Sequence, residues 1–164
     1  YGNMSRSAWL DSGLRDFPLG ATYSNNLVNH EEGVDDNEGS TTAPIAAYIS
    51  SAQFDLEGGH QFAFIWRILP DITFDGSEVD SPSATMTLLP LQSSGSGYNN
   101  PTSVGGTNSA GITRSAVLPV EQFTDQLFIR VRGRQLAIKV ESSGIGVTWQ
   151  LGSPRIDMRS DGRR

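Results

Sequence analysis

The sequence predicts an all-β protein, and three observations point to it. Short runs of alternating apolar and polar residues recur along the 164 residues, as in strands with one buried face. The 3.6-residue periodicity of an amphipathic helix is hard to find. The runs are separated by Gly, Pro, Asn and Ser, and the chain has 18 Gly and 8 Pro to form its turns. Its 37% of hydrophobic residues suffices for a buried core.

The expected strands follow one another with turn residues between them, and two longer stretches interrupt the series. Residues 30–44 are acidic and rich in turn residues, and residues 92–111 are rich in Gly, Ser and Asn. A loop as long as 92–111 is a binding loop, an assembly contact or a disordered segment. We expect an ordered assembly loop, with Tyr98 as its candidate contact residue. In chain order, the expected strands are 5–10, 26–31, 44–55, 60–69, 84–91, 110–118, 124–132, 135–141, 145–151 and 154–159.

The expected strand HQFAFIWRIL carries an aromatic face. Phe62, Phe64 and Trp66 share one side of it, and Ala63 and Ile65 lie on the other. Because one side of a sandwich strand fills the core, we expect the aromatic side to be buried. A stacking platform for sugars or nucleobases is the alternative for Trp66.

The segment 124–141 is predicted to form a β-hairpin that turns at Gly133. Apolar residues alternate with polar and charged ones on both sides of this glycine. In a hairpin, Arg130 and Arg132 would lie near Lys139 on the outer face, where like charges repel each other. The basic face therefore calls for an anionic partner, with neighbouring carboxylates or plain solvation as alternatives. A turn with positive φ at Gly133 would not tolerate β-branched residues.

Charge is shared unevenly along the chain. Residues 130–164 carry eight basic and three acidic residues, a formal charge of +5. Residues 1–129 carry four basic and fifteen acidic residues, a charge of −11. This asymmetry predicts either a segment that faces nucleic acid or complementary patches on neighbouring copies of one subunit. Charge that only keeps the protein soluble is the third interpretation.

Metal and nucleophile chemistry find little support in the sequence. The chain has no cysteine, which excludes disulfides, thiolate metal sites and cysteine nucleophiles. His30 and His60 stand apart, without the spacing of metal ligands. Asp35, Asp36 and Glu38 resemble part of a calcium loop but lack its alternating ligands and its distant Glu. A solvated turn is therefore expected there.

We predict no catalytic, cofactor-binding or metal-binding residue, and therefore no enzyme and no cofactor. Two carboxylate pairs, Asp55 with Glu57 and Asp71 with Asp75, would suit glycoside hydrolysis if their members met in space, but roles in turns and at strand ends are favoured. The glycines of GIGVTW precede no helix, so they are expected to serve turn geometry rather than nucleotide binding. No apolar run approaches the roughly 18 residues of a membrane-spanning helix.

Several stretches of the sequence resemble a known family. In segment 120–164 they are RVRGRQ, GVTWQLG and RIDMRSDGRR. Upstream they are RSAWLDSGLRDFPLG, HEEGVDDNEG and the segment 43–76. Together these stretches resemble the tail nozzle or hub proteins of short-tailed phages, of the tail-tubular or packaged-DNA-stabilising type. The motifs are structural, so they indicate a family rather than an activity.

The resemblance implies a subunit of a ring, expected to be a hexamer, in the tail of the virion, which assembles in the host cytoplasm. Its implied partners are adaptor and tail fibre or needle proteins, with double-stranded DNA passing through the channel. The implied fold is an antiparallel β-sandwich platform at 41–164 that follows, at 1–40, a linker and the last strands of a preceding β-rich, propeller-like body. Because the chain opens on Tyr1 within an expected strand, we expect it to be the carboxyl part of a longer polypeptide.

Charge and resemblance lead to the same expected function, a structural subunit of a tail nozzle or tube. A ring joins unlike patches head to tail, so the acidic and basic portions of one subunit can meet around the circle. We expect Arg130, Arg132, Arg134 and Lys139 to contact a neighbour's carboxylates, with DNA phosphate as the second candidate. The alternatives are a carbohydrate- or receptor-binding β-sandwich with exposed aromatic residues, and a glycan-degrading domain.

Overall fold

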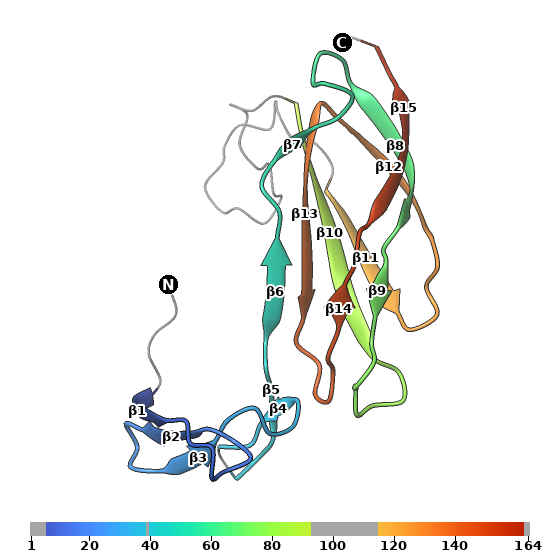
Figure 1. Cartoon of the computed structure of the whole chain (residues 1–164). Coiled ribbons are helices and arrows are strands. Elements are labelled where there is room, and N and C mark those ends of the chain that lie inside the picture. The colour runs from blue at the N-terminus through green and yellow to red at the C-terminus, as the bar shows by residue number, and fades with distance from the viewer. Residues whose placement is uncertain (1–5, 39, 93–114, 163–164) are drawn as a thin grey trace.

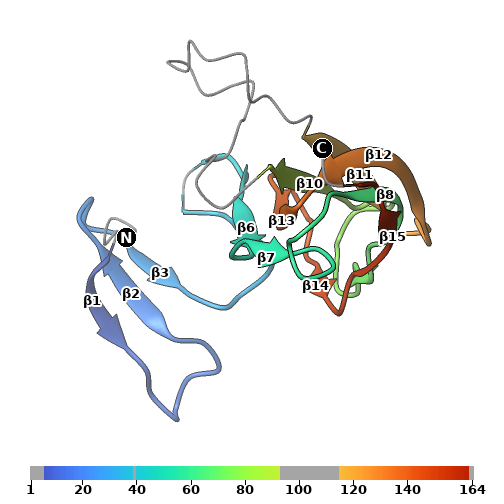
Figure 2. The same cartoon turned by 90° about the horizontal axis from the view of Figure 1, so that it is seen from above.

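The computed structural model describes residues 6–38, 40–92 and 115–162. Of these residues 51% lie in strands and none lies in a helix, so the predicted all-β class is confirmed. The described part of the chain therefore has no helix that could cross a membrane. A small group of N-terminal strands lies beside a larger body that carries the C-terminus (Figures 1 and 2).

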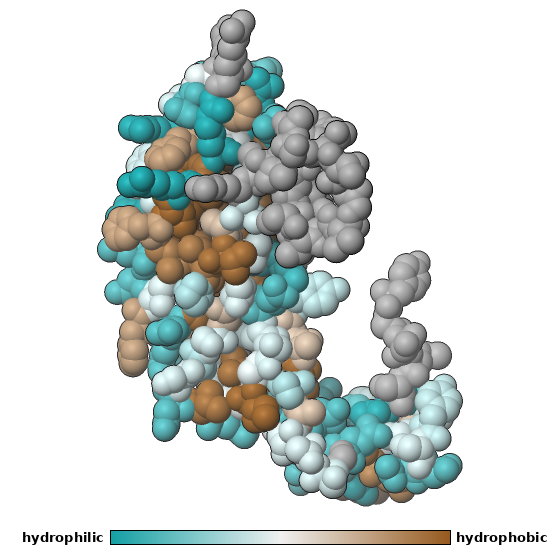
Figure 3. Space-filling view, turned by 180° about the vertical axis from the view of Figure 1, so that it is seen from behind, coloured by the Kyte–Doolittle hydropathy of each residue, from teal (hydrophilic) through white to brown (hydrophobic). Residues whose placement is uncertain are grey.

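Residues 6–45 form this N-terminal unit. Most of its large apolar side chains are exposed, and Leu14 is 98% exposed. The unit is mainly hydrophilic in Figure 3, whereas apolar side chains gather over the middle of the body. It therefore has little core of its own. Its strands are β1 (Arg6–Leu10), β2 (Leu19–Thr22) and β3 (Leu27–Asn29) in one antiparallel sheet, and β4 (Asp35–Asp36) paired with β5 (Ala43–Pro44).

The body contains two larger antiparallel sheets and a short two-stranded one. The first sheet has the strand order β11-β10-β13-β6, with β7 also paired to β13, and the second has the order β12-β8-β15. The short sheet pairs β14 with β9. The strands are β6 (Ala47–Ser50), β7 (Phe54–Asp55), β8 (Ala63–Leu69), β9 (Ile72–Thr73), β10 (Ser83–Leu91), β11 (Ala116–Glu121), β12 (Leu127–Gly133), β13 (Gln135–Ser142), β14 (Gln150–Leu151) and β15 (Arg155–Ser160).

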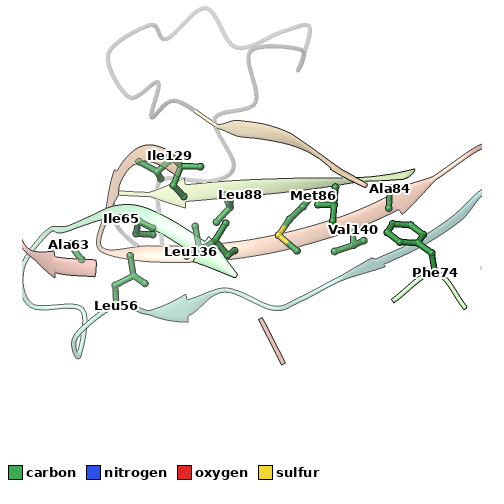
Figure 4. Packing of buried hydrophobic residues seen from close by; sticks show 13 residues of the cluster. Leu56, Ala63, Ile65, Phe74, Ala84, Met86, Leu88, Ile129, Leu136 and Val140 are labelled. Atoms are coloured by element: carbon green, nitrogen blue, oxygen red, sulfur yellow. The ribbon is translucent and has the colours of Figure 1, made fainter. Parts of the chain in front are cut away.

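One apolar core joins the two larger sheets. Most of its side chains come from β10 and β13 of the first sheet and from β8 and β12 of the second, and they gather between these strands (Figure 4). Burying a large aliphatic side chain contributes about 1.5–3 kcal/mol to folding, so this cluster stabilises the body. Its members are Leu56, Ala63, Ile65, Ile68, Phe74, Ala84, Met86, Leu88, Val120, Ile129, Val131, Leu136 and Val140.

The predicted hairpin at 124–141 is wrong, although both of its strands exist. β12 pairs with β8, whereas β13 pairs with β10, β6 and β7, so the chain crosses from one sheet to the other at Gly133. After the crossing, Arg134 donates its backbone N–H to the carbonyl of Leu91 in β10, at 2.9 Å. Alternation shows which side of each strand faces the core. Two strands that pair with each other and two strands that face each other across a core have the same alternation, so it does not show which strands pair.

The buried side of β8 is also opposite to the expected one. Ala63, Ile65 and Ile68 are fully buried, whereas Trp66 is 38% exposed. A bulge accounts for the two-residue gap between the buried isoleucines, because the pairing of β8 with both neighbours shifts register next to Trp66. The aliphatic residues fill the core, and the aromatic side faces outward.

Each of the other expected runs overlaps an observed strand, although most of the run 110–118 lies outside the described residues and it meets β11 only from Ala116. β2, β4 and β9 lie outside all expected runs, and the run 44–55 is divided between β5, β6 and β7. Of the run 145–151, only β14 is a strand. The expected boundary at residue 40 falls between the paired strands β4 and β5. Tyr98 and nearly all of the expected assembly loop lie outside the described residues.

Candidate interaction face

The outward side of the sheet β12-β8-β15 gathers arginines and aromatic residues. Strand register places Arg132 and Arg159 on either side of Phe64, and places Phe128 and Asp157 on either side of Arg67. With six arginines and two aspartates, this surface has a formal charge of +4. We call it the arginine face, and it consists of Phe62, Phe64, Trp66, Arg67, Phe128, Arg130, Arg132, Arg134, Arg155, Asp157, Arg159 and Asp161.

Period-two alternation builds this face. Ile129 and Val131 of β12 point into the core, so Arg130 and the residues on either side of the pair point outward. In β15, Ile156 and Met158 pack against the core, which turns the residues between and around them outward. The same residues that fill the core thus fix the positions of the charged ones.

Guanidinium groups cover two of the phenylalanine rings. The Cζ atoms of Arg132 and Arg134 lie 4.0 and 4.8 Å from the centre of the Phe62 ring. Arg159 lies over Phe64, with 5.2 Å between its Cζ and the ring centre. Cation–π contacts of this kind stabilise an exposed arginine by about 0.5–1 kcal/mol. They also occupy the ring faces, which leaves less aromatic surface for a stacking ligand.

Two ion pairs neutralise part of the face from within. Arg132 donates Nε–H to the carboxylate of Asp161, and its second amino group donates to the Asp161 carbonyl at 3.1 Å. Arg67 donates Nε–H to Asp157 Oδ2 at 2.5 Å and another N–H to Gln126 Oε1 at 3.2 Å. All four charged side chains are between 31% and 40% exposed, so each pair contributes modestly to stability.

Three exposed arginines of the face have no carboxylate partner in the part of the chain that the structure describes. Arg130, Arg155 and Arg159 are exposed, and none of them forms an ion pair with another residue of the described ranges. Each therefore presents a full positive charge to solvent or to a partner.

The predicted basic residues do not all come together. Arg130 and Arg132 lie on β12, whereas Lys139 lies on β13 in the other sheet, so the expected proximity of Lys139 to them is wrong. Lys139 instead donates to Glu141 Oε2 at 2.5 Å and lies 5.6 Å from the centre of the Tyr48 ring. Its charge is thus compensated within its own sheet.

Arg155 and Arg159 were missed in the sequence prediction. The stretch RIDMR alternates two arginines and an aspartate with Ile156 and Met158, in the same way that FIRVR alternates arginines with core residues. That pattern alone would place them outward. That they lie on the same face as the arginines of β12 could not be predicted. β8 lies between β12 and β15, and alternation does not show the order of strands in a sheet.

The N-terminal unit has the opposite charge. Its residues 6–45 include seven acidic and two basic side chains, a formal charge of −5. Glu31, Glu32 and Asp36 are exposed, and none of the three forms an ion pair within the described residues. All three line an open hollow of about 1240 Å³ in this unit.

Arg6 holds the N-terminal unit together. It donates Nε–H to Nε2 of His30 at 2.8 Å and another N–H to Glu38 Oε2 at 2.8 Å. The His30 ring lies 4.5 Å from the indole of Trp9. A Cβ at Gly20 would lie 2.7 Å from His30 Nε2, so a side chain there would displace the His30 ring. His30 and Glu38 thus have structural partners.

One carboxylate ties this unit to the body. Both oxygens of Asp35 accept the backbone N–H of Gly146, at 2.9 and 2.8 Å. Gly146 has a φ of 70°, in agreement with the expected turn role, and its carbonyl accepts the N–H of Glu78 at 2.8 Å. Asp35 is therefore a link between two parts of the fold.

The carboxylates considered for glycoside hydrolysis also serve local structure. Asp55 accepts from Gln135 Nε2 at 2.7 Å, and Glu57 accepts from the Ser160 hydroxyl. Asp71 has a φ of 50° and accepts the N–H of Ser153 at 2.6 Å. These contacts place the three acids at turns and strand ends. Within the described ranges, His, Asp and Glu residues form no group of three suited to a metal ion.

Comparison with known proteins identifies no relative. No protein-family model matches the chain, and no curated protein is similar to it in sequence. The resemblance of segment 120–164 to tail nozzle proteins therefore stays a prediction.

Proposed function

We propose that the chain is a non-catalytic structural subunit of a tail nozzle or tube ring of a short-tailed phage, part of the conduit that retains the genome and then passes it. Two lines of support lead to this proposal. One is the resemblance of the segments described above to that class of protein. The other is the separation of opposite charges on the fold, which suits assembly with copies of itself.

The separation of charge is the observation that carries the proposal. The arginine face has a formal charge of +4, and the N-terminal unit has a charge of −5. The N-terminal unit lies at the opposite end of the molecule from the C-terminal end of β15 (Figure 1). Unlike patches at different places on one subunit favour head-to-tail contacts, which close into a ring when the rotation allows.

The fold we infer for the body is an antiparallel β-sandwich, formed by the sheets β11-β10-β13-β6 and β12-β8-β15. The supporting observation is the single apolar core, to which Met86 and Leu88 contribute from one sheet and Ile65 and Ile68 from the other. Such a body would serve as the platform domain at 41–164. A domain with one tightly packed core deforms little under load, as the wall of a conduit requires.

Net charge also supports a conduit. The chain has a formal net charge of −6, which disfavours tight binding of a polyanion such as DNA to its surface. A duplex held by many basic side chains would bind strongly and slide with difficulty. We therefore assign the arginine face to contacts between subunits and treat DNA phosphate as its second candidate partner.

Assembly tests this function. We expect the purified chain to associate as its concentration rises, with a sedimentation coefficient that falls when salt is added, and to enter a ring visible by electron microscopy when mixed with adaptor and tail fibre proteins. A chain that stays monomeric at high concentration and forms no ring with these partners would exclude the proposal.

A carbohydrate- or receptor-binding role at the virion tail is the second candidate. The observation that favours it is the outward position of Trp66 and of Phe128, which is 72% exposed, on one face of the sheet. A glycan array would test this role. We would then expect bound glycans to be lost on Trp66→Ala but retained on Lys139→Ala, because Lys139 lies on the other sheet.

A further inference from the structure

We propose that the arginine face binds the acidic N-terminal unit of a second copy of this chain, with Arg130, Arg155 and Arg159 as its contacts to Glu31, Glu32 and Asp36. This inference rests on the proposed structural function and assigns the surface through which neighbouring subunits meet.

The three arginines differ from Arg67 and Arg132 in that no carboxylate of the described residues neutralises their charge. Arg67 and Arg132 have carboxylate partners within the chain. Arg130, Arg155 and Arg159 are exposed and have no such partner among the described residues. Charges left uncompensated on a packed face are the ones that a partner's carboxylates can neutralise.

The acidic side of the contact also carries charges that no ion pair of the described residues compensates. In the N-terminal unit, Asp35 is bound to the Gly146 amide and Glu38 to Arg6. Glu31, Glu32 and Asp36 are exposed and, like Asp11 and Asp16, lie outside any ion pair in the described ranges. Unlike those two, they line one hollow together. The three acids that share the hollow thus offer carboxylates to the three exposed guanidinium groups.

The fold prevents the same chain from closing this contact on itself. Seen from above, β6, β13 and β10 lie between the N-terminal unit and the sheet β12-β8-β15 (Figure 2). The hydrogen bonds from Gly146 to Asp35 hold the unit on that side. The arginine face therefore points away from its own acidic unit, and a neighbouring copy must supply the carboxylates.

The composition of the face suits a protein partner. Arginine and aromatic residues are enriched in protein–protein interfaces, where they act as anchors. Trp66 and Phe128 supply exposed apolar surface among the arginines. Phe62 and Phe64, by contrast, are covered by guanidinium groups, so few free rings remain on which bases of a nucleic acid could stack.

Charge reversal on both sides tests the contact. One full-chain variant combines Arg130→Glu with Arg159→Glu, and the other combines Glu31→Lys with Glu32→Lys. Each alone should weaken self-association at least tenfold, measured by sedimentation velocity at low salt, because like charges then face each other. Mixing the two variants should restore association, since each reversed surface again meets its complement. Lys139→Glu, a reversal on the other sheet and outside both surfaces, is the matched control and should leave association intact.

The outcomes separate this inference from the proposed function. If wild-type chains associate and the arginine variant associates equally well while remaining folded by circular dichroism, the assigned surface is wrong but the structural function stands. Absence of wild-type association contradicts both. If the double arginine variant does not fold, the single change Arg130→Glu at an exposed position gives the same comparison. Binding of duplex DNA that is lost in the arginine variant, with self-association unchanged, would assign the face to nucleic acid instead.

Discussion

Arg132 of β12 and Asp161, just after β15, are joined by an ion pair that passes over β8, the strand between them. The guanidinium also lies 4.0 Å from the centre of the Phe62 ring below it. Backbone hydrogen bonds join two of these segments, since Phe62, just before β8, donates its N–H to the Gly162 carbonyl at 2.8 Å and its own carbonyl accepts the Asp161 N–H at 2.7 Å. The ion pair therefore holds β12, β8 and β15 together at the C-terminal end of β15.

We expect Arg132→Ala to lower the free energy of unfolding by about 1 kcal/mol, because an ion pair and a cation–π contact of half-exposed groups are both lost. Urea denaturation would measure the change. Arg130→Ala is the matched control on the same strand, and it should leave stability unchanged, since Arg130 has no ion-pair partner in the described ranges. Equal effects of the two changes would contradict this assignment.

We predict that a side chain at Gly133 is destabilising because of close packing, and not because of a positive φ. Gly133 is not among the glycines with positive φ, so the left-handed turn that would exclude β-branched residues is not formed there. A Cβ there would lie 3.0 Å from both the Gln135 carbonyl oxygen and Pro90 Cβ. We expect Gly133→Ala to cost about 1–3 kcal/mol by overpacking, measured by thermal unfolding. Gly13→Ala should be close to neutral, because nothing lies within 4 Å of that position.

The crossing at Gly133 shows which part of the fold the sequence can predict. Alternation located β12 and β13 to within a few residues and placed Arg130 and Arg132 outward. It could not show that the two strands belong to different sheets, because strands that pair and strands that face each other across a core have the same pattern. The arginine face depends on that strand order, so only part of it could be predicted.

β8 shows a second limit of prediction from the sequence. Its two sides, one aromatic and one aliphatic, are both apolar enough to fill a core. The aliphatic side is buried, and the bulge beside Trp66 lets Ile65 and Ile68 both point inward although three positions separate them. A bulge breaks period two, so alternation cannot find it.

We expect the two sides of β8 to differ sharply in stability measurements. Ile65→Ala should lower the free energy of unfolding by about 2–5 kcal/mol, because it leaves a cavity in the core. Trp66→Ala should cost clearly less, since Trp66 is 38% exposed. Chemical denaturation of both variants would give the comparison. A larger loss for Trp66→Ala would show that the aromatic side is the buried one.

The link between Asp35 and Gly146 is predicted to control how firmly the N-terminal unit is attached. In Asp35→Ala, the Gly146 amide loses both acceptor oxygens, so we expect its hydrogen exchange to accelerate at least tenfold. Amides in β10 and β13 should exchange as in the wild type, because their ladder is untouched. Asp36→Ala is the matched control, since Asp36 Oδ1 accepts the Glu38 N–H, within the unit itself. Unchanged protection of the Gly146 amide in Asp35→Ala would show that the carboxylate does not hold the two parts together, and the unit would then be free to reach other surfaces of its own chain.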